Sequence, residues 1–337
     1  MLVRSLLEAL RAHGYDAELV SIPFRDYPRE ELLAHAAAWR LLNLDRALER
    51  PVDLVIATKF PTYFVRHPAK VVWLVHQHRA AYELCGTPFS DFEHTERDVA
   101  LRKRLIDLDT QMLGECIGRF SIARTVSARL ERYNGLTAEP LYHPPRLAGS
   151  LKAGPYGNYI VTVTRLEKVK RVDLAIEAFR HVAPPTRLVV VGDGSVRREL
   201  ESQIERLGLT DRVHLAGRVS DAELVELVAG ARAMVFVPFD EDYGYVTLEA
   251  FLSRKAVITT TDAGGPLEFV TDGVNGLVTA PTAQALAAAI ERLAGDARLA
   301  AQLGDAGYER ARLVTWDGVV DRLVGALGQG AEATSPA

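Results

Sequence analysis

The sequence predicts a mixed α/β fold made of two doubly wound, Rossmann-like domains, and three observations support this prediction. Short runs rich in β-branched residues alternate with helical stretches along the chain, which is typical of βαβ units around a parallel sheet. The run Leu188–Val191 is apolar at every position, as a strand covered by helices on both faces must be. The length of 337 residues is that of about two domains.

The first domain is expected at residues 1–145. Its pattern predicts helices at Leu2–Ala12, Arg29–Glu49 and His94–Gly118, and strands at Ala17–Ile22, Asp53–Ala57, Lys70–Val75 and Arg119–Arg124. A doubly wound domain normally opens with a strand that leads into a glycine-rich turn. Here a helix stands first, so the domain is expected to lack its first strand. Either the true start lies upstream, or the domain is rearranged.

A linker is expected at residues 146–157, because the region from Pro144 to Gly157 is rich in turn formers and has no apolar periodicity. The second domain follows at 158–314, then a C-terminal helix at 315–328 and a flexible tail at 329–337. The strands predicted in the second domain are Tyr159–Thr164, Arg187–Val191, Val213–Ala216, Ala233–Val237 and Val257–Thr260. The helices predicted there are Arg171–His181, Val196–Leu207, Asp221–Gly230, Val246–Ser253 and Ala283–Ala294.

Composition excludes several classes of protein. The apolar fraction is 48% and the charged fraction 25%, which is ordinary for a soluble globular chain. Two cysteines imply no disulfide framework and fit a reducing cytosol. No apolar run approaches the ~18 residues that a membrane-spanning helix needs. A net charge of −4 argues against a nucleic acid partner, which a strongly basic face would bind.

The most informative segment begins at Glu241 and ends at Glu249, where an apolar strand gives way to a helix. The start of that helix offers backbone N–H groups and a partial positive charge. Gly244 lets the backbone come close to a ligand, and a carboxylate accepts two hydroxyl hydrogen bonds, which suits a sugar or a ribose. The alternative is a solvated acidic loop that caps the helix.

A basic segment, Thr164–Arg171, directly follows the first strand of the second domain. Cations at the carboxyl edge of a parallel strand, just before a helix, are placed to hold phosphate. Arg165 and Lys170 are the pair singled out for this role. The alternative is an exposed basic loop.

Two weaker signals also stand at strand ends. The pair Gly264-Gly265 follows the strand Val257–Thr260, where it predicts either close approach of the backbone to a ligand or a tight turn. His76 and His78 follow the first-domain strand that ends at Val75, and each is either a site residue or a structural histidine.

Together these segments resemble the retaining family 4 glycosyltransferases, which have the GT-B fold, two Rossmann-like domains facing a cleft, and use nucleoside-diphosphate-sugar donors. The resemblance covers nearly all of the second domain and extends more weakly over the first, mainly through His76. The second-domain residues that carry it are Arg165-Leu166, Lys170, Gly192-Asp193-Gly194, Gly217, the Glu241 to Glu249 motif, and Gly264-Gly265 with Glu268.

The resemblance implies roles for individual residues. The catalytic set would be Glu241, His76, Arg165 and Lys170. The donor would be bound by Arg165, Lys170, Val219, Glu241, Asp242, Tyr243, Gly244, Tyr245 and Glu249. Within these sets, Glu241 would bind hydroxyls of the transferred sugar and Glu249 those of the ribose. Arg165 and Lys170 would contact the diphosphate, Val219 the base, and His76 would face the sugar from the acceptor-side first domain.

The resemblance also implies a reaction. A hexosyl group would move from the donor to a hydroxyl of a glycan or glycolipid acceptor, with retention, by front-side attack, without a metal or cofactor. The enzyme would work in the cytoplasm, with peripheral contact at the inner membrane face as an option, in envelope polysaccharide or glycolipid synthesis. The alternatives are a sugar-nucleotide epimerase and a non-catalytic nucleotide-sugar-binding protein.

One residue departs from the family motif, and one segment matches a metal-binding pattern of another kind of protein. In the family a glycine normally follows the phosphate-binding lysine, whereas Arg171 follows here, which adds a cation and a Cβ atom and leaves the turn geometry open. Asp107-Leu108-Asp109 matches a metal-binding Asp-x-Asp pattern, but it lies in a predicted helix, where residues i and i+2 do not share a face.

A dinucleotide fingerprint and a membrane surface are also disfavoured. The Gly192-Asp193-Gly194 turn lacks the third glycine of the fingerprint, where Arg197 stands, so a dehydrogenase is disfavoured. The helix His94–Gly118 carries four basic residues, but acidic residues are interleaved with them. A solvated face is therefore favoured over contact with an anionic membrane.

Overall fold

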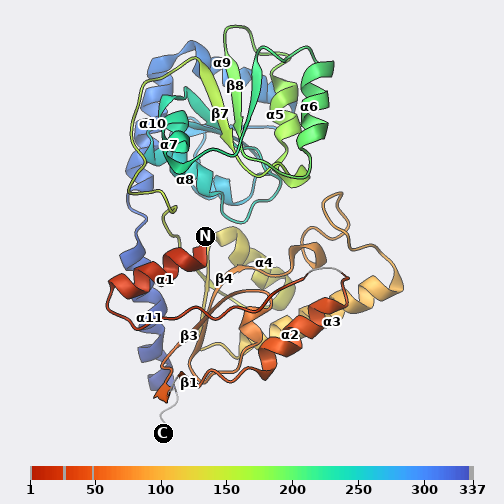
Figure 1. Ribbon diagram of the computed structural model, residues 1–337, viewed down its shortest axis with the longest axis vertical. Coiled ribbons are helices and arrows are strands. Elements are labelled where there is room, and N and C mark those ends of the chain that lie inside the picture. The colour runs from red at the N-terminus through yellow and green to blue at the C-terminus, as the bar shows by residue number, and fades with distance from the viewer. Residues whose placement is uncertain (1, 26–27, 48, 334–337) are drawn as a thin grey trace. The chain divides into compact units, whose positions relative to one another are not determined.

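The computed structural model describes residues 2–25, 28–47 and 49–333, and the chain divides into two units. One unit is formed by Met1–His143 together with Thr315–Ala337, and the other by Pro144–Val314 (Figure 1). Each unit contains a parallel sheet, so the mixed α/β class predicted from the sequence is confirmed.

The second unit contains a six-stranded parallel sheet. Its strands are β7 (Tyr159–Val163), β8 (Arg187–Val191), β9 (Val213–Gly217), β10 (Ala233–Val235), β11 (Val257–Thr260) and β12 (Gly276–Thr279). Their order is β12-β11-β10-β7-β8-β9, and Met234 of β10 pairs with Val161 of β7. The strand order therefore reverses between β7 and β10. In an open sheet of this kind that reversal is the topological switch point, where ligands bind at the carboxyl ends of the strands.

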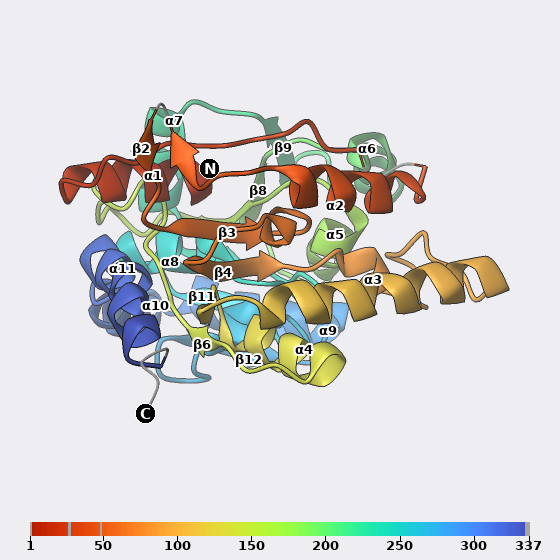
Figure 2. The ribbon, with the colours of Figure 1, turned by 90° about the horizontal axis from the view of Figure 1, so that it is seen from below.

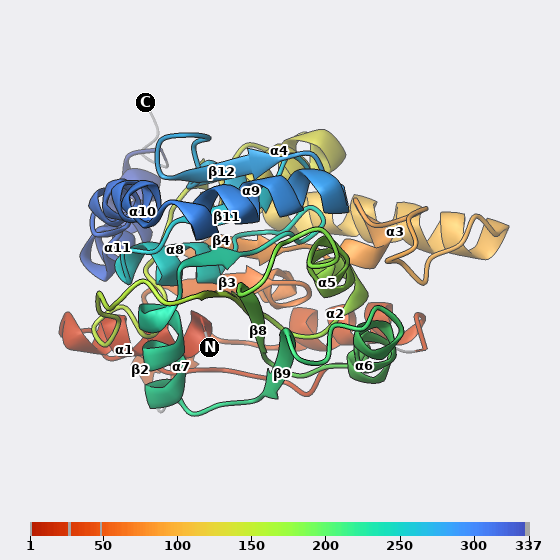
Figure 3. The ribbon, with the colours of Figure 1, turned by 90° about the horizontal axis from the view of Figure 1, so that it is seen from above.

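Helices cover both faces of this sheet, as its fully apolar strands require. They are α5 (Val172–Ala178), α6 (Arg197–Arg206), α7 (Asp221–Gly230), α8 (Tyr245–Leu252), α9 (Ala283–Gly295) and α10 (Ala297–Ala311). α5 contacts α6 and α9, whereas α8 contacts α7 and α10. Figures 1 and 3 show α5 and α6 on one side of the sheet and α7 and α8 on the other. A core of buried aliphatic residues joins β7, β8, β10 and β11 to α5, α6 and α9.

The first unit has a four-stranded parallel sheet of order β3-β4-β5-β6. Its strands are β3 (Val55–Lys59), β4 (Lys70–His76), β5 (Gly118–Ser121) and β6 (Glu139–Pro140), and a small hairpin is formed by β1 (Arg46–Ala47) and β2 (Arg50–Pro51). The helices are α1 (Leu2–Ala12), α2 (Glu31–Leu41), α3 (Glu96–Gly114), α4 (Arg124–Asn134) and α11 (Trp316–Ala333). α3 and α4 pack side by side (Figure 2), and α11 packs on β4, β5 and α1.

Aromatic rings fix α11 to the sheet of the first unit. His143 is fully buried between two tryptophans. Its ring stacks on Trp316 with centroids 5.6 Å apart and meets Trp73 of β4 edge-on at 5.0 Å. The indole Nε1 of Trp73 also donates to Leu141 O at 3.2 Å. The last helix of the chain is thereby anchored to the sheet of the first unit.

Several predicted elements are confirmed, among them α1, α7, β8 and β11, whose bounds match the sequence prediction. The predicted strand Ala17–Ile22 is wrong: the segment forms no strand, and Leu19 and Val20 are each 45% exposed. Among the described residues, none of the sheets includes this segment, and β3 stands at the edge of its sheet with β4 as its neighbour.

Several predicted helices differ from the observed ones in length, and two of them end well away from the predicted position. The helix expected at Arg29–Glu49 ends at Leu41, because the chain turns where the Asn43 side chain accepts from Asp45 N at 2.8 Å. The C-terminal helix continues to Ala333, into the predicted tail 329–337, whose last residues 334–337 lie outside the described residues. The sequence prediction also missed α4, α10, β6 and β12.

The predicted linker at 146–157 forms neither helix nor strand, but its end is bound to the second unit. Lys255 Nζ donates to Gly154 O and Pro155 O at 2.9 and 3.0 Å, and lies 3.8 Å from the centre of the Tyr156 ring. Arg232 Nε donates to Gly157 O at 3.1 Å. These contacts hold residues 154–157 in place.

Candidate functional site

The candidate site lies at the switch point of the second unit, where the loops after β7, β10 and β11 meet. The loop after β7 contains a short 3-10 turn, η3 (Lys168–Lys170). Backbone hydrogen bonds join the loops: Phe239 N donates to Val169 O, and Glu241 N donates to Ala263 O, each at 2.8 Å. The three loops therefore form one connected surface at the carboxyl ends of the central strands.

Lys170 and Glu241 form an ion pair at the centre of this surface. The Lys170 ammonium donates to Glu241 Oε2. The lysine side chain is only 10% exposed and the glutamate side chain 16%. A charge-assisted hydrogen bond in such a partly desolvated place is stronger than one on an open surface. The structure thus brings together two residues that the sequence placed in different segments.

Arg165 lies on the same loop as Lys170 and is exposed. Within the described part of the chain, its guanidinium has no hydrogen-bonding or ionic partner. The loop therefore presents one cation that is paired with a carboxylate and one that is available to an anion.

The Gly192-Asp193-Gly194 turn packs directly against this loop. A Cβ atom at Gly192, whose φ is +130°, would lie 1.8 Å from Thr164 O, and one at Gly194 would lie 2.3 Å from Leu166 O. Leu166 N donates to Asp193 O at 3.0 Å. Both glycines are required here because backbone packs on backbone.

The glycine pair after β11 has the same function for the loop that carries Glu241. A Cβ atom at Gly264 would lie 2.6 Å from Glu241 O, and one at Gly265 would lie 2.7 Å from Asp242 O. Gly265 N donates to Glu241 O at 2.7 Å. The pair lets the backbones of the two loops come into contact.

The amino end of α8 follows this loop. Gly244 has φ +81° and is the N-cap residue of the helix, where it contributes no side chain to cap it. Tyr243 is buried against Phe269, with ring centroids 5.3 Å apart. Asp242 and Tyr245 are half-buried, and burial raises the pKa of the Tyr245 hydroxyl. A helix start of this kind favours a negatively charged group.

Glu249 lies further along α8, and burial raises its pKa to about 7. Two charged residues act on it: Arg146 lowers the pKa and Asp221 raises it. These two residues are themselves joined by two hydrogen bonds, at 2.7 and 2.6 Å. At neutral pH the Glu249 side chain is therefore close to its pKa, and hydroxyl groups of a ligand that donate to it would favour the charged form.

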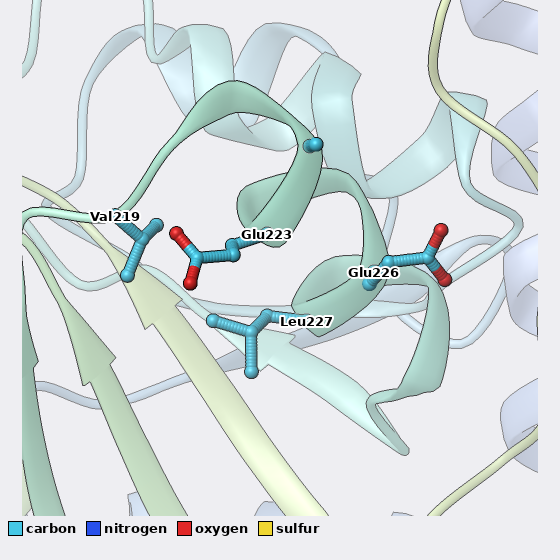
Figure 4. Close-up of a pocket in the computed structure, with 5 residues that line it drawn as sticks. Val219, Glu223, Glu226 and Leu227 are labelled. Carbon is cyan, nitrogen blue, oxygen red and sulfur yellow. The ribbon is translucent and has the colours of Figure 1, made fainter.

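Val219 lines a hollow of about 480 Å³ beside α7 (Figure 4). Its other lining residues are Ala222, Glu223, Glu226 and Leu227, all on the helix. Glu223 also caps α7 through Ser220, whose N–H donates to its carboxylate at 2.9 Å. With two carboxylates on its wall the hollow does not suit a phosphate group.

His76 ends β4 in the first unit, and it is half-buried. Its Nδ1 lies 2.6 Å from Gln77 O, a contact that fixes the ring. The Gln77 amide is buried and donates to Asn134 Oδ1 of α4 at 3.1 Å. The carboxyl end of β4 is therefore held by polar contacts.

The rejected Asp-x-Asp pattern lies within α3, as predicted. Asp107 is exposed and pairs with Lys103 at 3.0 Å, whereas Asp109 is buried and accepts from Tyr82 at 2.6 Å. Over the ranges that the structure describes, no three His, Cys, Asp or Glu side chains are placed to hold a metal ion together. Nor does any helix in those ranges have the length and apolarity to cross a membrane.

The sequence prediction missed two residues of this site, Arg171 and Asp262. The Arg171 guanidinium binds the Asp262 carboxylate with two hydrogen bonds, at 2.8 and 2.7 Å. From the sequence, Arg171 stands out only as a departure from the family pattern. The available signal for Asp262 was a charged residue two positions after the end of β11, where loop residues reach the carboxyl edge of the sheet.

Comparison with known proteins gives a family match for the second unit. Residues 150–310 match the family described as "Glycosyl transferases group 1". An exopolysaccharide phosphotransferase of Streptomyces coelicolor is 34% identical over 179 residues, 49% of this chain and 19% of the relative. A lipopolysaccharide core biosynthesis mannosyltransferase of Rhizobium leguminosarum is 31% identical over 189 residues, 51% of each chain. The chain thus spans about half or less of these two relatives.

Solved structures extend the likeness to the whole chain. Sucrose-phosphate synthase from Thermosynechococcus elongatus superposes with a TM-score of 0.74 at 20% identity, over 99% of this chain and 93% of that one. Anabaena HepE in complex with UDP gives 0.64 at 21% identity, over 77% and 72%. These similarities show the fold, which is the GT-B type that the family resemblance implied.

Proposed function

We propose that this chain is a retaining, metal-independent glycosyltransferase that moves a hexosyl group from a nucleoside-diphosphate-sugar to an acceptor hydroxyl. The observation that carries the proposal is the Lys170–Glu241 ion pair at the switch point, with the exposed Arg165 on the same loop. A diphosphate needs cations and a transferred sugar needs hydrogen-bond acceptors. The site offers both within one connected set of loops.

The two cations act on the leaving group. Cleavage of the sugar–phosphate bond leaves a developing oxocarbenium ion and a diphosphate that gains negative charge. Arg165 and Lys170 would stabilise that charge as it develops, which lowers the barrier rather than only tightening donor binding. Because they supply positive charge, the reaction we propose needs no metal ion.

Donor binding would also change the partner of Lys170. Without donor its ammonium is bound to Glu241. A diphosphate carries more negative charge than one carboxylate, so it would attract the ammonium and leave Glu241 to accept hydrogen bonds from the sugar hydroxyls. Glu249 would accept from the ribose, and the start of α8 would lie toward the anionic donor.

Retention would follow from front-side attack. The acceptor oxygen forms its bond to the anomeric carbon on the face that the diphosphate leaves. The departing phosphate oxygen takes the acceptor proton, so no covalent sugar–enzyme bond is formed. Glu241 therefore acts as a hydrogen-bond acceptor and not as the nucleophile, and His76 would contact the transferred sugar.

The donor and pathway are inferred from the relatives. UDP is bound in the HepE structure. One curated relative is named an exopolysaccharide phosphotransferase, and the other a lipopolysaccharide core biosynthesis mannosyltransferase. We therefore propose a UDP-linked sugar as the first donor to test. We propose a glycan or glycolipid of the cell envelope as acceptor, with the enzyme in the cytoplasm or at the inner membrane face.

The test is thermal stabilisation by a panel of nucleoside diphosphates, each with and without EDTA. A ligand that binds the native state at a hundredfold excess over its Kd adds about 2.7 kcal/mol of stability. We expect one diphosphate to raise the melting temperature and the rise to survive EDTA. No shift with any diphosphate would contradict the proposed donor site, and a shift abolished by EDTA would contradict metal independence. Product analysis with the matching sugar nucleotide separates transfer from epimerisation.

A further inference from the structure

The Arg171 side chain makes five hydrogen bonds within the candidate site. Its side chain is only 14% exposed. Nε donates to Val237 O at 2.8 Å, and Nη2 donates to Pro238 O at 2.7 Å. The remaining contacts go to the Asp262 carboxylate and to Thr260 Oγ1, the latter at 2.9 Å.

These contacts join three separate segments. Val237 and Pro238 lie in the loop that leads to Glu241, and Asp262 lies in the loop after β11. Arg171 itself directly follows Lys170. One guanidinium therefore ties the backbone beside Lys170 to the backbone that carries Glu241.

The backbone of Arg171 adopts a conformation that favours glycine. Its φ and ψ are +50° and +41°, in the left-handed region, which L side chains rarely adopt. The turn thus keeps the geometry that a glycine would give, although a Cβ atom and a long side chain are present. The contacts of the guanidinium compensate for that disfavoured conformation. Because its donors are used on protein acceptors, Arg171 is not a third cation for phosphate.

We infer that Arg171 is a positioning residue, which holds Lys170 and Glu241 in register by fixing their two loops to Asp262. The inferred effect on catalysis rests on the proposed transferase function. The inferred effect on the Lys170–Glu241 pair does not, and it can be measured without any substrate.

The first measurement is the reactivity of the Lys170 amine. Acetylation is followed at single lysines by mass spectrometry, with the exposed neighbour Lys168 as internal reference. The variant Arg171→Gly suits the left-handed backbone, so it removes the guanidinium without new strain. We expect Lys170 to be acetylated about tenfold faster in Arg171→Gly, as loss of charge-assisted hydrogen bonds implies. Lys168 should be unchanged.

Arg232 provides the matched control. It is another half-buried arginine of the second unit that binds carbonyl groups, here those of Gly157 and Ala294, each at 3.1 Å. It lies just before β10, at the amino end of the strand, away from the switch point. Arg171→Lys and Arg232→Lys both exchange a planar fork for a single ammonium. We expect only Arg171→Lys to speed acetylation of Lys170.

The second measurement is kinetic. In Arg171→Gly we expect kcat to fall about tenfold or more, with a smaller change in the donor KM, because the pair is misplaced for the transition state. Added guanidinium ion should raise the kcat of Arg171→Gly part of the way to the wild-type value, and it should not raise the kcat of the wild type. Arg232→Lys should keep the wild-type kcat.

The outcomes separate the two proposals. Unchanged acetylation of Lys170 in Arg171→Gly would overturn the positioning role, whatever the enzyme does. Faster acetylation with wild-type kcat would overturn the inferred effect on catalysis. A third outcome is that Lys170 is acetylated faster in Arg171→Gly, while the wild-type protein transfers no sugar from any nucleotide donor. That outcome would overturn the proposed function and support the positioning role.

Discussion

The Lys170 ammonium donates to the Glu241 carboxylate, and each side chain is less than a fifth exposed (10% and 16%). The two residues come from loops about seventy positions apart in the chain (|i−j| = 71), which are next to each other only because β7 and β10 are neighbours in the sheet. A pair with so little solvent gains from its Coulomb attraction, but each partner pays a desolvation cost. Removal of one partner therefore leaves a charge without compensation in a partly buried place.

We first predict the effect of breaking this pair. Lys170→Met and Glu241→Gln should each lower kcat/KM for transfer by about a hundredfold or more, because each removes a group that acts on developing charge or on the sugar. Both variants should remain folded, as judged by circular dichroism. The loss of stability in the double variant should be smaller than the sum of the two single losses, by about 0.5–3 kcal/mol, since the double variant leaves no unpaired charge. Near-wild-type transfer by either single variant would exclude that residue from the reaction.

We next predict a pH dependence that arises from Glu249, whose pKa burial raises to about 7. Only the charged carboxylate accepts both ribose hydroxyl hydrogens, so nucleoside diphosphate affinity should rise with pH until about pH 7. Below about pH 7, the affinity can rise by at most about tenfold per pH unit. Titration calorimetry in two buffers of different ionisation enthalpy should detect proton release on binding. In Glu249→Gln we expect weaker binding that no longer depends on pH in this range; an unchanged pH profile would exclude Glu249 as its source.

The same shift has a consequence for stability without ligand. The native state holds this proton up to about pH 7, whereas the unfolded chain loses it near 4.5, the ordinary value for glutamate. The contribution of Glu249 to the free energy of unfolding therefore falls as pH rises through that window. Comparison of wild type with Glu249→Gln by urea unfolding at pH 5 and pH 7.5 checks the sign.

A secondary-structure element could be predicted from the sequence where its own residue pattern determines it, and not where contacts with distant segments determine it. Strands such as Arg187–Val191 could be predicted, because continuous apolar runs have few other uses in an α/β chain. Ala17–Ile22 also has apolar and β-branched residues, but Glu18 and Ser21 interrupt them. A strand forms only when a neighbouring strand pairs with it, and that pairing cannot be predicted from the segment alone. The helix at Ala297–Ala311 was missed because alanine and glycine blur its apolar stripe.

The candidate site shows the same division. The residue types and strand-end positions of Lys170 and Glu241 made both predictable as site residues, but their pairing depends on the strand order β10-β7. Arg171 could be noted only as an exception. Its partners Val237 and Pro238 contribute carbonyl groups, which every residue has, so no sequence pattern could reveal the contact.

A third prediction concerns the anchoring of α11 by the stacked rings of Trp316 and His143. Trp316→Ala should lower the free energy of unfolding by about 2–3 kcal/mol, below the range for a fully buried tryptophan because this one is half-buried. Urea unfolding followed by far-UV circular dichroism measures the loss. Leu313→Ala is the control, since that side chain is 70% exposed and should change stability by less than about 0.5 kcal/mol. Equal effects of the two variants would mean that the stack does not anchor the helix.

A last prediction separates two glycines that differ both in backbone conformation and in what surrounds them. A Cβ atom at Gly192 would lie 1.8 Å from Thr164 O, and the φ of +130° is itself unsuited to an L side chain, whereas a Cβ atom at Gly295 meets nothing within 4 Å. Gly192→Ala should therefore destabilise the second unit by about 3–5 kcal/mol, because backbone must move to admit the methyl group. Gly295→Ala ends α9 with a better helix former and should be neutral or stabilising by up to about 1 kcal/mol. Because the Gly192 turn packs on the segment beside Arg165, Gly192→Ala should also weaken diphosphate binding under conditions where it remains folded. A thermal shift titration of both variants measures stability and affinity together, and a Gly192→Ala protein as stable as Gly295→Ala would show that this turn is not tightly packed.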